Sequence, residues 1–179
     1  MKRTLSIVSL TSIFLSTAAF AQSAGEQTGV NSALGIAPKT VDFIKEAAIS
    51  DMLEIEAAKI AEQKGHATEK KFAGQMITDH TKTSSELKRM VSGDVKIAIP
   101  ASLDDSSQKK LDKLRNAKPE DFAGEYDPMQ VSAHKDATSL FERYAKGGDD
   151  PRLKDWAGKA LPALQHHLEM AQDMNKNRK

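Results

Sequence analysis

Three histidines of this chain lie where helical periodicity turns their side chains toward the protein interior. His80, His134 and His167 each fall on the apolar stripe of a different predicted helix. Glu54 falls on a stripe of small residues in a fourth predicted helix. Four-helix bundles build polar sites in their cores from side chains that project inward from separate helices. The sequence therefore predicts a buried site of three imidazoles and one carboxylate.

This set of side chains is suited to a transition metal ion. Imidazole nitrogen and carboxylate oxygen are ligands for zinc, iron or copper, and a chain without cysteine offers no thiolate. The Glu-x-x-His motif of di-iron carboxylate proteins is absent, because Ile77, Val131 and Leu164 stand three residues before the histidines. We therefore expect one metal ion bound by the three histidines and Glu54, rather than a di-iron oxidase or an iron store.

The same residues also fit a purely structural role. In that case Glu54 pairs with one histidine in a buried hydrogen-bond network. Nearby polar side chains satisfy the other histidines, namely Asp79, Ser84 or Tyr126. Asp79 is not expected to orient its neighbour His80, because adjacent residues of a helix point in different directions.

Two functional hypotheses follow from these alternatives. The first is a metal-binding bundle, with weak redox activity or none, that serves metal handling or stress resistance in the cell envelope. The second is a structural or partner-binding envelope protein whose core histidines serve packing and hydrogen bonding. An enzyme would need an open coordination position and a path for its substrate. The sequence favours a protein that is not an enzyme, because it contains no glycine-rich phosphate loop and no convincing catalytic triad.

The periodic segments of the chain are typical of α-helices, and no segment has the alternation of a β-strand. Thr40 is the expected N-cap of the first long helix, which ends at Gly65. Asp127-Pro128 should interrupt the helical segment that Pro119 opens, so the third long helix is expected to restart there. The predicted helices cover residues 40–65, 67–91, 106–116, 127–147 and 151–174.

The lengths of the connections predict how these helices are arranged. The turn at Gly65 is too short for anything but an antiparallel pair. Residues 92–118 are long enough to cross the molecule, and they include the short helix 106–116. We therefore predict an all-α protein, an antiparallel four-helix bundle with a crossover connector and a short extra helix between the second and third long helices.

The first 21 residues have the pattern of a secretion signal. Lys2 and Arg3 precede an apolar run, and the run ends in a small-x-small site with cleavage expected after Ala21. Residues 22–37 are expected to form a flexible lead-in, and residues 38–176 the helical domain. We expect a periplasmic protein with no stable membrane span after cleavage, because no second long apolar run follows.

Charge excludes one class of partner. Without residues 1–21 the chain has 24 basic and 25 acidic residues, a formal net charge of −1. Nucleic acid is therefore not an expected partner. No pattern in the sequence specifies a protein partner or an oligomeric state.

Several short motifs, in a fixed order and spacing, resemble one known family. The motifs are Phe43-x-x-x-Ala47-Ala48, Glu54-Ile55, Phe72-Ala73-x-x-Met76-Ile77-x-Asp79-His80, Phe122 with Tyr126, Val131-x-x-His134-x-x-x-x-x-Leu140-Phe141, and Leu161-Pro162-x-Leu164-x-x-His167-Leu168. They span residues 41–174 and resemble the exported ferritin-like family catalogued as domain of unknown function 4142. The resemblance implies a ferritin-like four-helix bundle and an exported location, and it implies no activity. The chain departs from the family's more continuously helical pattern at Asp127-Pro128.

Overall fold

The computed structural model describes residue 26, residues 29–92 and residues 97–178. The predicted signal segment 1–21 and its cleavage site lie outside the described residues. Within those residues the regular structure is entirely helical and contains no strand, which confirms the prediction of an all-α protein. None of the helices in the described part combines the length and the apolarity that crossing a bilayer requires.

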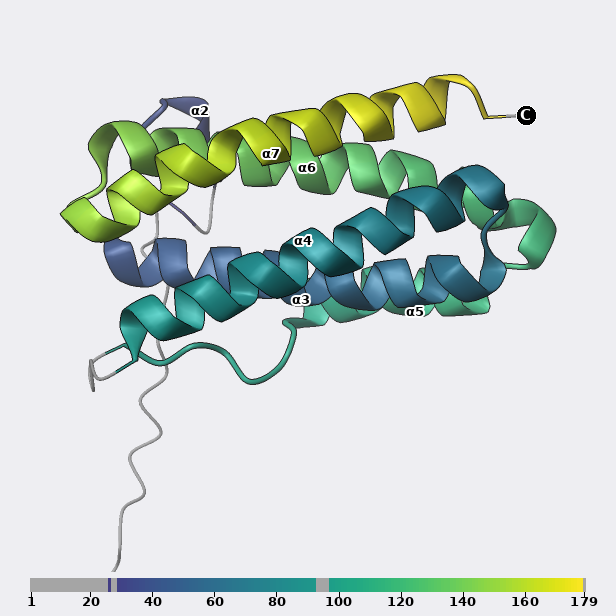
Figure 1. Ribbon diagram of the computed structural model, residues 1–179, viewed down its shortest axis with the longest axis horizontal. Helices are drawn as coiled ribbons and strands as arrows, with labels where there is room; N and C mark the ends of the chain where they lie inside the picture. Colours follow the sequence, from purple (N-terminus) through teal and green to yellow (C-terminus); the bar gives the residue numbers. More distant parts are fainter. Residues whose placement is uncertain (1–25, 27–28, 93–96, 179) are drawn as a thin grey trace, which may run out of the picture.

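Four long helices lie side by side along the long axis of the molecule (Figure 1). The most extensive contacts join α3 to α4 and α6 to α7. Three shorter elements complete the described fold. The elements are α2 (Val30–Ala33), α3 (Thr40–Lys64), α4 (Ala67–Val91), α5 (Asp105–Asn116), the 3-10 turn η1 (Pro119–Asp121), α6 (Phe122–Gly147) and α7 (Pro151–Lys176).

The connections set the directions of the long helices. Gly65 and His66 alone join α3 to α4, so these two helices run antiparallel (Figure 1). A Cβ atom at Gly65 would lie 2.7 Å from the carbonyl oxygen of Ala61, which explains a residue without a side chain at this tight turn. The segment between α4 and α6 carries the chain from one end of the molecule to the other, and α5 within it packs against α3. As a result α4 and α6 run in the same direction.

Polar caps fix the starts of the helices. Asp150 accepts hydrogen bonds from the backbone N–H groups of Arg152 and Leu153 at 2.8 and 3.0 Å, which confirms the predicted start of α7. The expectation for Thr40 is wrong, because it is the first residue of α3 and makes no capping bond. Its hydroxyl group instead bonds the hydroxyl of Tyr144, 2.5 Å away on α6. A tertiary hydrogen bond has thus replaced a local one.

The predicted interruption at Asp127-Pro128 is also wrong, because α6 continues through both residues. Pro128 has no N–H to donate to the carbonyl oxygen of Gly124, and a proline inside a helix costs about 3 kcal/mol. Tyr126 and His134, on either side of this proline, are fully buried. Packing of these side chains offsets the lost bond, and it keeps His134 on a continuous helix.

A layer of buried polar side chains divides the core into two apolar clusters. We call this layer the polar layer; it consists of Asp51 and Glu54 on α3, His80 on α4, Gln130 and His134 on α6, and His167 on α7, each at most 5% exposed. One apolar cluster lies toward the α6–α7 turn and includes Phe43, Leu87, Phe141, Tyr144, Trp156 and Leu164. The other lies toward the α3–α4 turn and includes Phe72, Met76, Leu111, Phe122, Tyr126 and Met174.

Part of the predicted lead-in contacts the helices. Glu26 forms a buried ion pair with Arg143 of α6, with a carboxylate oxygen 2.7 Å from a guanidinium nitrogen. The short helix α2 also packs against α6. The segment before α3 is therefore in contact with the helical domain at these residues.

Candidate metal centre

The three histidines predicted to share a site meet in the polar layer. One ring nitrogen from each of His80, His134 and His167 lies within 4.8 Å of the other two. The ring centroids are 5.7 Å apart for His80 and His134, 5.6 Å for His80 and His167, and 5.5 Å for His134 and His167. The three rings therefore form a nearly equilateral triangle.

Helical periodicity explains why these rings point inward. On α4, Met76 lies one turn before His80 and Leu87 two turns after it, and both are buried. On α7, Leu164 and Ala171 flank His167 in the same way. Residues three or four positions apart share one face of a helix, so each apolar stripe carries its histidine into the core.

Carboxylates on neighbouring helices orient two of the rings. Nδ1 of His80 lies 2.8 Å from Oδ1 of Asp51, which also accepts a 2.9 Å bond from the Thr83 hydroxyl. Nε2 of His167 lies 2.8 Å from Oδ2 of Asp79. A charged carboxylate accepts in such bonds, so each ring donates its N–H outward from the centre.

The backbone orients the third ring. Nδ1 of His134 lies 2.9 Å from the carbonyl oxygen of Gln130, one turn earlier on α6. A carbonyl oxygen can only accept, so Nδ1 of His134 carries the proton and Nε2 carries a lone pair.

The second nitrogen of each ring has no hydrogen-bond partner within the described part of the chain. These atoms are Nε2 of His80, Nε2 of His134 and Nδ1 of His167. Buried polar atoms in proteins nearly always have a partner. Three exceptions in one triangle of rings are the arrangement that a metal ion would complete.

Burial and charge set the protonation of the rings. Burial lowers the pKa of His134 below its usual value, and it lowers the pKa of His167 to about 4. Burial acts in the same direction on His80, but the hydrogen bond to Asp51 and the charge of Glu54 outweigh it, so the pKa of His80 is raised. At neutral pH His134 and His167 are therefore neutral and able to bind a metal ion.

Glu54 is buried beside this triangle but does not belong to it. Its side chain is 1% exposed, and neither carboxylate oxygen has a hydrogen-bond partner among the described residues. The group of converging ligand atoms contains the three histidines and not Glu54. Its negative charge nevertheless helps to raise the pKa of His80, and it opposes the larger effect of burial that lowers the pKa of His134.

Of the two orienting carboxylates, the sequence indicated Asp79 as an acceptor under the packing hypothesis and did not identify Asp51. Asp79 points away from its neighbour His80, as expected, and reaches His167 on the facing helix. Asp51 lies three residues before Glu54 on the same side of α3, and this spacing was the one signal that could have found it. Among the acceptors of the packing hypothesis, Asp79 bonds a histidine, whereas the Tyr126 hydroxyl has no partner in the described structure.

The donor set fits a metal ion on chemical grounds. Zinc binds imidazole nitrogen at about 2.0–2.1 Å, so three nitrogens around one ion lie about 3.3 Å apart. A contraction of at most about 1.5 Å along each edge of the triangle would bring the converging nitrogens, now within 4.8 Å, to this spacing. Metal-bound histidines commonly donate their second N–H to a carboxylate or a backbone carbonyl, which is the arrangement found for all three rings.

Comparison with known proteins identifies the family. A family model described as Domain of unknown function (DUF4142) matches residues 25–174. The chain belongs to the DUF4142 family. Comparisons of this DUF4142 protein with curated proteins and with solved structures found no match.

A groove between α4 and α7 reaches the centre of this DUF4142 protein. It has a volume of about 440 Å³, and His80, His167 and Asp79 contribute to its lining. The remaining wall is largely apolar and includes Trp156 and Leu164. The groove approaches the triangle from the side of His80 and His167, because His134 is not part of the lining.

Proposed function

We propose that this DUF4142 protein binds one transition metal ion in its core through His80, His134 and His167. The observation that carries the proposal is the convergence of three rings: one nitrogen of each lies within 4.8 Å of the others, and one nitrogen of each has no hydrogen-bond partner among the described residues. Zinc, iron and copper are the ions that suit three imidazoles. Bound there, such an ion would supply positive charge and a Lewis-acid centre in the polar layer.

The protein's own residues have separate roles in this proposal. Asp51 and Asp79 accept the outward N–H groups of His80 and His167, so the inward nitrogen of each ring is the one that would bind the ion. At His80, whose pKa is raised, a metal ion would displace any proton on that nitrogen. Glu54 balances the positive charge of the ion. Its burial without a hydrogen-bond partner among the described residues supports this role, because a buried carboxylate without a counter-charge costs several kcal/mol.

We propose a ferritin-like four-helix bundle as the architecture that holds this site. The four long helices, their short turns and the long α4–α6 connection support an antiparallel bundle with a crossover connector. The secretion-signal pattern of residues 1–21 supports export to the periplasm. In that compartment the protein would serve metal handling or stress resistance, with weak redox activity or none.

The alternative function is a structural or partner-binding envelope protein in which the histidines serve packing. The hydrogen bonds of the three rings to Asp51, Asp79 and the Gln130 carbonyl favour it. They satisfy only one nitrogen of each ring, however. Each unsatisfied buried polar atom costs about 1–3 kcal/mol, so packing alone leaves a considerable energy uncompensated.

Metal analysis of the exported protein tests the proposal. The full chain, without a histidine tag, is purified from the periplasm and its metal content is measured by mass spectrometry. We expect about one ion per chain, and a loss of most of it in the His80→Gln/His167→Gln variant. His166→Gln is the matched control, because His166 lies on the same helix with its side chain 68% exposed. A metal content that is substoichiometric and unchanged by the double substitution would favour the packing role.

A further inference from the structure

The groove between α4 and α7 brings the metal centre within reach of small molecules. Both His80 and His167 are at most 3% exposed, yet both contribute to the groove's lining. The nitrogens of these rings that lack partners are Nε2 of His80 and Nδ1 of His167. Two histidines that each have a partnerless ring nitrogen therefore line one cavity, which is a feature of ligand sites.

Coordination number leaves room for a ligand from outside. Three protein nitrogens and a fourth, exchangeable position are typical of zinc sites that bind small molecules. Glu54 is not part of the converging group, so the fourth position is open to a ligand from outside the chain. Because His80 and His167 line the groove and His134 does not, an incoming ligand would pass between the first two.

The charges of the groove and of the metal ion together favour an anionic ligand. Asp79 and Glu86 accept hydrogen bonds from neutral partners, the ring of His167 and the indole N–H of Trp156 at 2.9 Å, and both keep their negative charge. Lys159 pairs with Asp155. Lys82 and Arg89 are exposed and form no ion pair within the described residues. These two cations offset the charges of Asp79 and Glu86 along the groove, and the bound metal ion supplies the positive charge that attracts an anion.

We propose that the α4–α7 groove admits a small monovalent anion, which binds the metal ion between His80 and His167. This inference rests on the proposed metal binding. Lys82 and Arg89 favour the entry of an anion, and the apolar part of the wall disfavours a multiply charged one. Anions of one to three atoms fit this class, including halides, azide and superoxide.

Azide binding to the copper-loaded protein tests the inference. The untagged full chain is loaded with Cu²⁺, and azide is added while the charge-transfer absorption and the electron paramagnetic resonance spectrum are recorded. We expect a saturable change in both spectra. In the Lys82→Glu/Arg89→Glu variant, the dissociation constant for azide should rise about tenfold at low ionic strength, with a smaller difference at high salt.

Two further variants separate the groove from general effects. Lys70→Glu/Lys71→Glu makes the same charge change elsewhere on α4 and should leave azide affinity within about twofold of the wild type. Ala163→Phe narrows the groove at an exposed residue of its rim and should slow azide binding without changing the copper content.

The outcomes distinguish this inference from the proposed function. Copper bound at one equivalent with no azide-dependent spectrum would overturn the anion site and leave the metal site standing. Azide binding that is unchanged in both the Lys82→Glu/Arg89→Glu variant and the Ala163→Phe variant would overturn the route through the groove. If no metal binds to the wild-type protein, the proposed function fails and this inference fails with it.

Discussion

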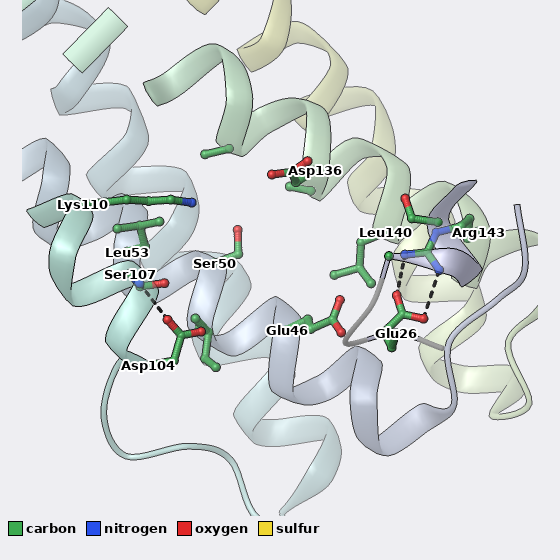
Figure 2. Close-up of a pocket in the computed structure, with 15 residues that line it drawn as sticks. Glu26, Glu46, Ser50, Leu53, Asp104, Ser107, Lys110, Asp136, Leu140 and Arg143 are labelled. Atoms are coloured by element: carbon green, nitrogen blue, oxygen red, sulfur yellow. Dashed lines mark hydrogen bonds and ion pairs between the residues drawn. The ribbon is translucent and has the colours of Figure 1, made fainter. Parts of the chain in front are cut away.

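Two polar regions of the molecule differ in whether the chain supplies a partner for a buried carboxylate. In the polar layer, Glu54 has no hydrogen-bond partner among the described residues. In a second pocket, between α3, α5 and α6, Glu26 lies against Arg143, and Figure 2 shows this ion pair at one end of the pocket. The pocket has a volume of about 360 Å³ and also contains Glu46 and Asp136.

The difference between these regions separates a site that needs a ligand from one that does not. Arg143 of the second pocket is itself 8% exposed and compensates Glu26 with a cation from the chain. The polar layer has three ring nitrogens without partners and a carboxylate, and no lysine or arginine of the described chain lies in this layer. An ion from outside would complete the polar layer, whereas in the second pocket the chain itself supplies the cation that pairs with Glu26.

Removing the cation of the second pocket should have the largest effect on stability. Arg143→Met leaves Glu26 buried without its partner, and breaking a buried ion pair costs about 3–5 kcal/mol. Urea denaturation at neutral pH measures this loss. A loss below about 1 kcal/mol would show that the Glu26–Arg143 pair is solvated, and the contrast between this pair and Glu54 would then fail.

The matching substitution in the polar layer should act in the opposite direction. Glu54→Gln removes a buried charge that has no partner in the described structure, so the metal-free protein should gain about 1 kcal/mol of unfolding free energy. The same denaturation measurement applies, with chelator present. Destabilisation by this variant would indicate that the carboxylate has a favourable partner in the protein itself.

Metal binding should stabilise the protein through the polar layer, and the second pocket should not contribute to this gain. At a free zinc concentration of 1,000 times the dissociation constant, the wild-type protein should gain about 4 kcal/mol. Thermal unfolding with zinc and with chelator measures the gain. The His80→Gln/His167→Gln variant should lose it, while Asp136→Asn in the second pocket should retain it.

The orienting carboxylate should have a smaller effect on the metal than the ligands do. Asp79→Asn keeps an acceptor for His167 but removes its charge, so metal affinity should fall about 10- to 100-fold. Competition with a chromophoric chelator measures the dissociation constant. An unchanged affinity would mean that Asp79 serves packing and not the metal.

A further effect concerns the pH dependence of the second pocket. Burial, followed by the charge of Glu26, raises the pKa of Glu46 to about 7. The folded state therefore binds more protons than the unfolded state between pH 4.5 and about 7, and stability falls as the pH rises through this window. Glu46→Gln should remove this slope and stabilise the protein at pH 8 by about 1–2 kcal/mol, after allowance for partial exposure. Denaturation at pH 5 and pH 8 provides the test, and equal effects at both would contradict it.

Local sequence patterns predicted much of the fold. The bounds of α4 and the Asp150-Pro151 start of α7 agree with the structure, because caps, glycine and proline act on their own neighbourhood. Where tertiary contacts compete with local preference, the patterns were insufficient. Packing around Pro128 keeps α6 continuous, and the hydroxyl of Thr40 bonds Tyr144 instead of capping α3.

The candidate site was predictable only in part for the same reason. Periodicity alone placed His80, His134 and His167 in the interior, and the structure brings them together. The bond from His167 to Asp79 depends on how α4 and α7 are rotated and offset against each other, which no single helix encodes. The secretion signal and the identity of a bound metal remain predictions.

The position of the polar layer between two apolar clusters has a consequence for how the helices align. A slip of one helix by a single turn, about 5.4 Å, would move an imidazole against side chains such as Phe72 or Leu87 and leave its proton without an acceptor. The aliphatic and aromatic clusters alone would tolerate such a slip far better. The histidines and their acceptors thus fix the axial register of the long helices, even before any ion is bound.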